Sequence, residues 1–388
     1  MSTSNKRAAK VLVVGGGVGG LVGANALARL LASEIANGSI EVTVIDRSSQ
    51  HYYQPSFLFV VMNLEQPSRT HRSVRSLLDN RVTFVQAEVD AIDLAARRVV
   101  LVGGQSLSYD FLLVAPGVRL DRESIPGLAL TEHFYSLESA EVLRQRLGDL
   151  EGGHVVVGVS SLPYKCPPAP LEMVLMLDSA LRSAGRRDSF QLSFAFPMPI
   201  PFPGPGLAGP IGAMLQERSI EQVLSFELAS VEEHRELVST SGQRVPFDLA
   251  VVIPPNAPDA VVDRSSFPGG GWIAVDKMTL EVPGLEGVYA LGDAAGLPTS
   301  KNGSGAELQA QVAARRIRDR LHDVTPTDTY DGTGMAFMVT GLDEAALISS
   351  NYTRQASQMS PSRPMHWMKL LYNELYWSLT VKGKLSGE

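Results

Sequence analysis

Short apolar runs alternate with longer stretches rich in alanine and leucine along the start of the chain. Residues 11–14 are a continuous run of valine and leucine, which is typical of a buried parallel strand. Residues 21–35 favour a helix, and residues 40–45 predict a second strand that ends at Asp46. A strand, a helix and a second strand in this order predict a βαβ unit and an α/β fold.

Three glycines lie at the turn between the first predicted strand and its helix. Gly15, Gly17 and Gly20 have the spacing that lets the backbone turn tightly and approach a pyrophosphate at the helix N-terminus. Asp46 lies where a carboxylate binds the ribose hydroxyls of an adenosine. The segment predicts dinucleotide binding; the alternative is a glycine-rich turn in an unrelated α/β domain.

A second segment, far along the chain, distinguishes FAD from NAD. Residues 288–291 predict a short strand, Gly292 and Asp293 follow it, and a helix is expected from Ala306 to residue 321. The segment resembles the second FAD-binding motif of flavoproteins with two dinucleotide-binding domains. That resemblance implies that Asp293 binds the ribityl or pyrophosphate side of FAD and that the helix dipole stabilises negative charge on the flavin. We therefore predict FAD as the cofactor.

Ala115 and Gly117 resemble the strand and turn at which the chain of such flavoproteins leaves the FAD domain. The usual segment reads Ala-Thr-Gly, whereas this chain has Pro116 in the middle position. Proline removes a backbone donor from the turn.

The second expected nucleotide-binding turn has lost its glycines. Residues 154–159 predict a buried strand after a helix over residues 136–150. Only Gly158 of a second glycine motif is present, and Pro163 occupies the space where backbone approaches a pyrophosphate. We expect a second Rossmann-like domain with a degenerate NAD site, so NADH and NADPH are poor electron donors.

Cys166 follows this strand and is the only cysteine of the chain. A single cysteine excludes an internal disulfide and a cysteine-rich metal site, and we expect no metal. The neighbouring Lys165 and the start of a helix are both features that lower a thiol pKa. They favour a redox or sulfur-bonding role; an inert buried cysteine is the alternative.

With these residues in view, the chain resembles the sulfide:quinone oxidoreductases and the flavin subunits of flavocytochrome c sulfide dehydrogenase. Cys166 before a proline-rich helix start is typical of that group, and so are the segment around Pro55, the segment from Lys301 to Gln309, and residues 330–334. The resemblance implies a small sulfur substrate such as sulfide, a quinone as electron acceptor, and Lys301 beside the flavin.

The chain departs from that group in one respect. The second redox cysteine is expected near Ala336, and none is present. A relay through a disulfide is therefore excluded, but one thiol can still take sulfur from sulfide as a persulfide while two electrons pass to FAD. Glu172, six residues after Cys166, is a candidate proton acceptor; the alternative is an acid on a solvated helix face.

The C-terminal residues 361–385 are aromatic, apolar and flanked by lysines, and they contain Trp367 and Trp377. Such a helix suits a membrane interface, where it could admit a quinone. A helix docked on the protein or at a dimer interface of a homo-oligomer fits the pattern equally well.

Composition narrows the class of protein. The chain has 388 residues, 44% of them hydrophobic, and a net charge of −7. It holds enough apolar material for large cores, and its charge argues against nucleic acid as a partner. No targeting segment and no membrane-spanning stretch stand out, so we expect a cytoplasmic protein, at most peripheral on the inner face of the membrane.

We expect two Rossmann-like domains in the arrangement of glutathione reductase, with a small C-terminal domain. Residues 1–114 and 247–321 form the FAD domain, residues 115–246 the second domain, and residues 322–388 the C-terminal domain. Two other functions stay open beside FAD-dependent sulfide oxidation: an NADH:quinone-type dehydrogenase, and a non-catalytic FAD-binding or sulfur-carrier subunit. Reduction of the flavin by NADH, by sulfide or by neither distinguishes the three.

Overall fold

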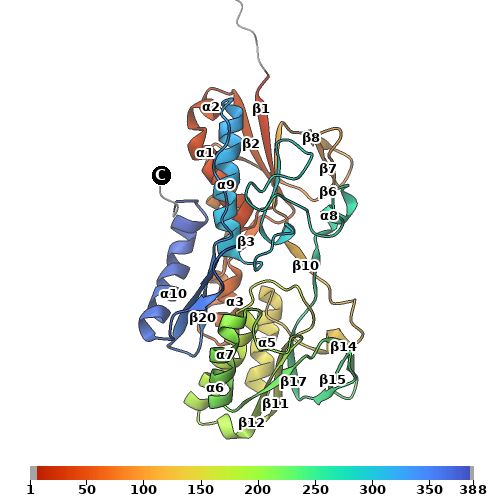
Figure 1. Cartoon of the computed structure of the whole chain (residues 1–388), viewed down its shortest axis with the longest axis vertical. Coiled ribbons are helices and arrows are strands. Elements are labelled where there is room, and N and C mark those ends of the chain that lie inside the picture. Colours follow the sequence, from red (N-terminus) through yellow and green to blue (C-terminus); the bar gives the residue numbers. More distant parts are fainter. Residues whose placement is uncertain (1–6, 385–388) are drawn as a thin grey trace, which may run out of the picture.

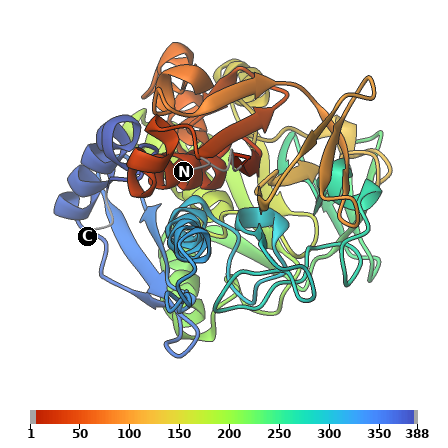
Figure 2. The same cartoon turned by 90° about the horizontal axis from the view of Figure 1, so that it is seen from above.

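The computed structural model describes residues 7–384 of the chain. It has the expected α/β architecture, with two parallel sheets in separate domains, one above the other in Figure 1. The C-terminal segment lies along one flank of both domains (Figures 1 and 2).

The first domain is built on a parallel sheet of five strands in the order β19-β9-β1-β2-β5. Its strands are β1 (Ala9–Val14), β2 (Ile40–Asp46), β5 (Thr83–Gln86), β9 (Phe111–Val114) and β19 (Val288–Ala290). The helices α1 (Val18–Leu30) and α9 (Gly303–Leu321) pack against each other on one face, with α2 (Ala32–Ala36) after α1. Valines and leucines of β1 are buried on both faces of this sheet, which explains its continuous apolar run.

Smaller elements complete this domain. An antiparallel sheet is formed by β6 (Val89–Asp93), β7 (Arg98–Leu101) and β8 (Ser106–Ser108), and α8 (Ala260–Arg264) packs on it. A hairpin-like pair, β3 (Gln50–Tyr52) and β4 (His71–Ser73), flanks α3 (Phe57–Val61), and α4 (Val74–Leu77) follows β4. α3 is buried in the core of the second domain, against α5 (Leu137–Asp149), so it joins the two domains.

The second domain has a parallel sheet of four strands in the order β13-β12-β11-β17. These are β11 (Gly153–Val159), β12 (Phe190–Phe196), β13 (Ile220–Leu224) and β17 (Leu249–Ile253), with α6 (Ala169–Ser183) and α7 (Pro205–Glu217) as further helices. An antiparallel sheet of β14 (Leu228–Glu232), β15 (Glu236–Ser239) and β16 (Arg244–Pro246) completes it.

The boundary between the domains differs from the predicted one. β17 is hydrogen-bonded to β11 in the second sheet, so the chain returns to the first domain after Ile253 rather than at residue 247. Two short antiparallel strands, β10 (Val118–Leu120) and β18 (Asn256–Pro258), form the double crossing between the domains.

The C-terminal segment is an antiparallel sheet of β20 (Gly334–Val339), β21 (Ala345–Ser350) and β22 (Ser357–Gln358), followed by α10 (Arg363–Leu375). A π-helical turn over Tyr376–Thr380 continues α10. Within residues 7–384, no helix combines the length and the apolar character needed to cross a membrane.

Candidate active site

The glycine turn after β1 is held by close backbone contacts. Gly15 has a φ of 107°, and a Cβ on it would lie 2.2 Å from the carbonyl oxygen of Ala115. A Cβ on Gly20 would lie 1.8 Å from the carbonyl oxygen of Gly15. Only glycine fits at either position, because any side chain would overlap backbone that cannot move. The turn, α1 and the end of β9 are therefore packed as one unit.

The middle glycine of this turn faces open space. Gly17 is the N-cap of α1, and a Cβ on it would meet no heavy atom within 4 Å. No side chain caps this helix N-terminus, so its first N–H groups lack the partner that a serine or aspartate usually provides. An open glycine at an uncapped helix N-terminus fits a pyrophosphate, which would accept these N–H groups.

Asp46 lies at the end of β2 beside the glycine turn. One of its carboxylate oxygens accepts a hydrogen bond from the N–H of Gly16 at 2.5 Å, and the other accepts from the N–H of Ser48 at 2.7 Å. These bonds fix the carboxylate next to the turn, where a ribose next to the pyrophosphate would meet it.

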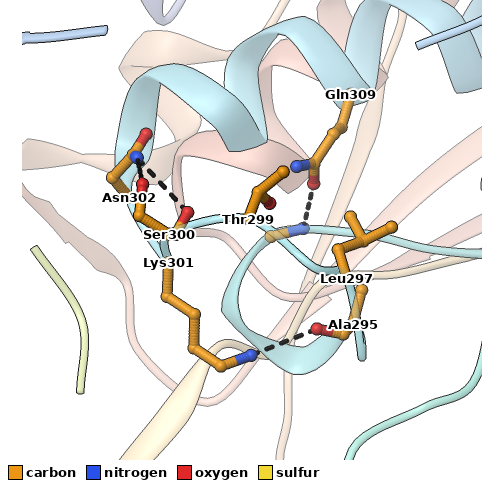
Figure 3. A pocket seen from close by; sticks show the side chains of 8 residues that line it. Ala295, Leu297, Thr299, Ser300, Lys301, Asn302 and Gln309 are labelled. Carbon is orange, nitrogen blue, oxygen red and sulfur yellow. Dashed lines mark hydrogen bonds between the residues drawn. The ribbon is translucent and has the colours of Figure 1, made fainter. Parts of the chain in front are cut away.

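The second predicted FAD segment, Gly292 and Asp293, lies against the start of α9. Gly292 has a φ of 67°, and a Cβ on it would touch the Cβ of Ala306 on α9 at 3.4 Å. Its N–H donates to the side-chain oxygen of Gln309 at 2.7 Å (Figure 3). Burial raises the pKa of the Asp293 carboxyl, while Lys165 and Lys301 lower it. A Cβ on Gly19 of α1 would lie 2.4 Å from the Leu291 side chain and 3.7 Å from the Cβ of Ala306, so residues from both ends of the chain line one site.

Lys301 extends from the loop before α9 toward Ala295, as Figure 3 shows. Its ammonium donates to the carbonyl oxygens of Asp293 at 2.7 Å and Ala295 at 3.1 Å, and it lies 3.8 Å from the ring centroid of Trp272. Burial lowers the pKa of Lys301 to about 8, and the Asp293 carboxylate opposes this shift. A small cavity lined by Lys301 and Gln309 lies here.

Cys166 is held by backbone contacts on both sides. Its N–H donates to the carbonyl oxygen of Lys301 at 2.7 Å, so the thiol loop and the lysine loop are directly joined. The Tyr135 hydroxyl donates to the carbonyl oxygen of Lys165 at 2.7 Å, and the Tyr164 hydroxyl donates to that of Pro167 at 3.0 Å. Cys166 itself has a φ of 54°, a left-handed conformation that is strained for a non-glycine residue and persists where the surroundings fix it.

The expected low pKa of the thiol is wrong for this environment. Burial raises the pKa of Cys166 to about 12; Glu172 and Asp293 add to the shift, and Lys369 opposes it. The ammonium of Lys165 donates to the side-chain oxygen of Gln54 at 2.8 Å; it is coupled to the thiol, but its charge does not offset the effect of burial on the thiol pKa. Cys166 also precedes α6 by three residues rather than starting it. The lysine and the helix start that the sequence offered are therefore outweighed by the burial of the sulfur.

Glu172 is not on a solvated face. It lies in the first turn of α6 with 7% of its surface exposed, and one of its carboxylate oxygens accepts from the N–H of Val339 at 2.8 Å. Burial raises its pKa, while Lys369 and the Val339 N–H lower it. A buried carboxyl close to a thiol is suited to hold a proton.

The remaining predicted residues lie at the edges of this site. Pro55 is in an exposed 3₁₀ turn, Gln54–Ser56, whose Gln54 is the partner of Lys165. Gly117 has a φ of 78°, and a Cβ on it would meet no heavy atom within 4 Å. The structure therefore brings the first glycine turn, Asp46, Ala115, the Gly292 turn, Ala306 and Lys301 together, and it adds Cys166 through the Lys301 backbone.

Further residues beside the site stood outside the predicted site residues. Lys369 and Trp272 are buried or half-buried partners of the site from distant segments, and no local motif marks them. His51 is 5% exposed; its ring joins the Gly16 carbonyl oxygen, at 3.0 Å, to the Tyr376 hydroxyl, at 2.7 Å. Burial lowers the pKa of His51 to about 4, which keeps its ring neutral near neutral pH. The aromatic character of the C-terminal segment was the one available signal.

The turn after β11 is hydrogen-bonded to neighbouring segments of its own domain. Ser160 follows β11 and is fully buried; its N–H donates to the Ile253 carbonyl oxygen at 3.1 Å and its carbonyl oxygen accepts from the Leu228 N–H at 3.0 Å. Gly15, the corresponding residue after β1, donates in the same way to the Ile45 carbonyl oxygen at 2.9 Å, so the two turns differ in the residues that follow. The loss of the NAD site stays a prediction, based on the missing glycines and on Pro163.

Residues 9–161 match the family described as pyridine nucleotide-disulphide oxidoreductase. The chain is 26% identical to the mitochondrial sulfide:quinone oxidoreductase of Mus musculus, over 97% of this chain and 87% of the relative. It is 26% identical to the corresponding protein of Dictyostelium discoideum, over 99% of this chain and 88% of the relative. The solved structure of the sulfide:quinone oxidoreductase from Aquifex aeolicus superposes with a TM-score of 0.85 at 18% identity, covering 98% of this chain and 93% of that one.

These matches confirm the resemblance drawn from the sequence. They also confirm the α/β fold with two Rossmann-like domains, the FAD-binding class and the expectation of an oxidoreductase.

Proposed function

Taking the chain as an FAD-dependent oxidoreductase that resembles the sulfide:quinone oxidoreductases, we propose that it oxidises sulfide, or a related small sulfur compound, at Cys166 and passes the electrons to a quinone. The observation that carries this proposal is the hydrogen bond from the Cys166 N–H to the Lys301 carbonyl oxygen. It joins the only thiol of the chain to the loop that leads from the Gly292 turn into α9.

The residues that would hold FAD are those of the two glycine turns. Gly15, Gly17 and Gly20 with the N-terminus of α1 would bind the pyrophosphate, Asp46 the adenosine ribose, and Asp293 the ribityl side. Ala115, Gly117, Pro55 and Ala306 would line the remainder. Bound FAD would supply a two-electron acceptor that can be reoxidised by a quinone.

The sulfur chemistry needs only one thiol. Hydrosulfide and the Cys166 thiol would give a Cys166 persulfide, one proton and two electrons. A second hydrosulfide, or another small thiol, would then attack the outer sulfur of the persulfide and leave as a hydropersulfide, so that the Cys166 thiol is restored. Glu172 would accept the released proton, because it is buried close to Cys166 and its pKa is raised. Lys301 would stabilise negative charge at the flavin.

The C-terminal helix fits a peripheral position on a membrane. Its outer face exposes Trp367 (68% exposed), Met368, Leu370 and Leu371 (57% exposed), and Met335 of β20 is exposed as well. A half-embedded face of this kind would let a quinone approach from the lipid. This placement on the inner face of a membrane is part of the proposal.

Anaerobic titration of the purified yellow protein tests the function. We expect sulfide to bleach the visible absorbance of the oxidised flavin, a quinone analogue to restore it, and Cys166→Ala to abolish the bleaching. Bleaching by NADH alone would instead support the NADH:quinone-type dehydrogenase. Bleaching by neither compound would favour a non-catalytic FAD-binding or sulfur-carrier subunit.

A further inference from the structure

His51 joins the glycine turn of the first domain to the C-terminal segment. The residue lies in β3, and only 5% of its surface is exposed. Its Nδ1 lies 3.0 Å from the carbonyl oxygen of Gly16, and its Nε2 lies 2.7 Å from the hydroxyl oxygen of Tyr376. Two segments that are far apart in the sequence therefore meet on the two nitrogens of one buried ring.

These two partners fix which nitrogen of the ring carries the hydrogen. A carbonyl oxygen can only accept a hydrogen bond, so Nδ1 carries the hydrogen and donates to Gly16. Burial lowers the pKa of His51 to about 4, so the ring is neutral near neutral pH and Nε2 has a free lone pair. The Tyr376 hydroxyl therefore donates to Nε2, and this bond stabilises the Nδ1–H tautomer relative to the other one.

The Gly16 carbonyl group belongs to the peptide unit that leads into Gly17, the N-cap of α1. A trans peptide is planar, and its C=O and N–H point in opposite directions. By holding the Gly16 carbonyl group, His51 therefore fixes the direction of the Gly17 N–H. This N–H has no hydrogen-bond partner among residues 7–384, as a group that binds a pyrophosphate at a helix N-terminus would require.

The glycine turn needs such a contact because it has no side chains of its own. Glycine loses more conformational freedom than any other residue when it is held in one conformation. The Gly16 N–H donates to the Asp46 carboxylate at 2.5 Å, and its carbonyl oxygen accepts from His51, so both sides of this residue are fixed. Of these two bonds, the one from His51 is tied to the C-terminal segment.

Tyr376 is itself held firmly in place. It is 4% exposed, and the segment that follows it is docked on α1. The Asn25 amide donates to the carbonyl oxygen of Val381 at 2.9 Å. The Arg29 guanidinium donates to that of Lys382 at 2.6 Å. The C-terminal segment is thus bound to the same helix whose N-terminus would receive the pyrophosphate.

We propose that His51 is a positioning residue for FAD: its Nδ1–H holds the Gly16 carbonyl group so that the Gly17 N–H stays available to the pyrophosphate, and the Tyr376 hydroxyl keeps the ring in the tautomer that does so. The C-terminal segment thereby contributes to cofactor affinity without touching the cofactor through this residue. This role rests on the proposed function only in assigning the first glycine turn to the pyrophosphate of FAD, and it does not depend on the sulfur substrate.

Two variants with amide side chains separate the two ring nitrogens. In His51→Asn the amide takes the place of Nδ1, whereas in His51→Gln it takes the place of Nε2. The dissociation constant of FAD is measured from the flavin released over a dilution series of the holoprotein, for both variants, for Tyr376→Phe and for Tyr376→Phe combined with His51→Asn. Tyr372→Phe is the matched control, because it removes a hydroxyl from the same segment that faces Glu307 instead of His51.

We expect His51→Gln to weaken FAD binding about tenfold, the effect of one lost hydrogen bond, and His51→Asn to stay within about threefold of wild type. Tyr376→Phe should weaken binding about threefold on its own and have no further effect in the His51→Asn background, where the tautomer no longer matters. Tyr372→Phe should match wild type. A side chain that only fills space would not distinguish the two amides.

The tautomer of the ring gives a second measurement. Long-range proton–nitrogen correlation spectra of the holoprotein with labelled histidine should show His51 as the Nδ1–H tautomer, and Tyr376→Phe should increase the share of the other tautomer. The signal of His51 is assigned by its absence in His51→Asn or, if that variant does not fold, by its change in Tyr376→Phe.

An Nε2–H tautomer in wild type would overturn the proposal. Equal FAD affinities of His51→Asn and His51→Gln, whether retained or lost, would overturn it as well, provided that circular dichroism is unchanged. If neither variant folds, the tautomer and the FAD affinity of Tyr376→Phe decide. Loss of FAD in Gly17→Ala without loss in His51→Gln would reject this role of His51 alone, whereas no loss in either variant would also reject the assignment of the glycine turn to the pyrophosphate.

Discussion

The two turns that follow β1 and β11 begin in the same way and end differently. After β1, Gly17 faces open space at an uncapped helix N-terminus. After β11, the Ser160 backbone is bonded to Ile253 and Leu228, and the chain continues to Cys166 before α6 begins. Three glycines lie between β1 and α1, and we call them the open turn. Nine residues without a glycine lie between β11 and α6 and carry the thiol; three of them are prolines, which have no N–H to offer an anion, and we call this segment the closed turn. Nucleotide binding thus depends on which residues form the turn, and the fold alone does not decide it.

The largest expected effect comes from the turn that carries the thiol. Cys166→Ala should lower the rate of flavin reduction by sulfide at least about 1,000-fold, because no second thiol can replace the nucleophile. Stopped-flow absorbance under anaerobic conditions measures this rate. FAD content should equal that of wild type, since the first turn is untouched; a variant that keeps the wild-type rate would show that sulfide does not react at Cys166.

The second-largest expected effect comes from a substitution in the open turn. Gly17→Ala should lower FAD affinity on the order of 100-fold, because the added Cβ fills the space where a pyrophosphate would approach. The fold should tolerate the change, since a Cβ there meets no atom within 4 Å and Gly17 has an ordinary φ of −73°. Bound flavin per chain, measured after gel filtration, checks this.

Gly148→Ala is the matched control for that variant. Gly148 lies exposed in α5, and a Cβ on it also meets no atom within 4 Å. Flavin content should be unchanged, with stability raised by about 0.5–1 kcal/mol from helix propensity. Equal flavin content in the two variants would contradict the assignment of the open turn to the pyrophosphate.

Most features of the two turns could be predicted from the sequence, because they depend on short local patterns. The first βαβ unit, its glycines, Asp46 and the Gly292 turn were predicted from short segments, and the absence of a second glycine motif predicted the closed turn. The boundary at residue 247 was wrong, since the pairing of β17 with β11 is a long-range choice between two sheets that both suit an apolar run.

The raised pKa of the Cys166 thiol could not be predicted either, because it too depends on how distant segments pack around the sulfur. The sequence suggested that Lys165 lowers the thiol pKa, but Lys165 binds Gln54 and the burial of the sulfur, which depends on distant segments, outweighs its charge. Lys369, whose charge lowers the thiol pKa, is 203 positions away in α10, a helix that buries this lysine and exposes Trp367. A helix reversed in this way gives the same residue periodicity as an ordinary one, so the pattern alone cannot say which face is buried.

Two buried glutamates extend the comparison to the helices of the two domains. Glu172 of α6 has a backbone donor, and the charge of Lys369 lowers its pKa, whereas Glu307 of α9 has, among residues 7–384, only the Tyr372 hydroxyl at 3.4 Å. Burial raises the pKa of Glu307 from 4.5 to about 7. A carboxyl with a raised pKa in the folded state stabilises the protein below pH 4.5, and this contribution is lost as the pH rises to about 7.

Glu307→Gln should therefore raise the free energy of unfolding at pH 8 by about 1–2 kcal/mol and change it little at pH 4.5, because the amide never ionises. Chemical denaturation at both pH values measures the difference. Glu374→Gln, an exposed position on α10, is the control and should be near neutral at both. Equal effects of Glu307→Gln at both pH values would show that Glu307 keeps an ordinary pKa.

The smallest expected effect comes from removing a hydrogen bond that fixes the closed turn. Tyr135→Phe removes the hydroxyl that donates to the Lys165 carbonyl oxygen, next to the left-handed Cys166, and should cost about 1 kcal/mol of folding free energy. The loop would be less firmly fixed, so alkylation of Cys166 by iodoacetamide should become a few-fold faster, on the order of the same 1 kcal/mol. The open turn should not respond, because Tyr135 has no contact with it through the hydrogen bonds of the described residues. A faster alkylation with unchanged flavin content would show that the two turns are held independently, whereas loss of flavin would show that the Cys166 loop also supports the FAD site through Lys301.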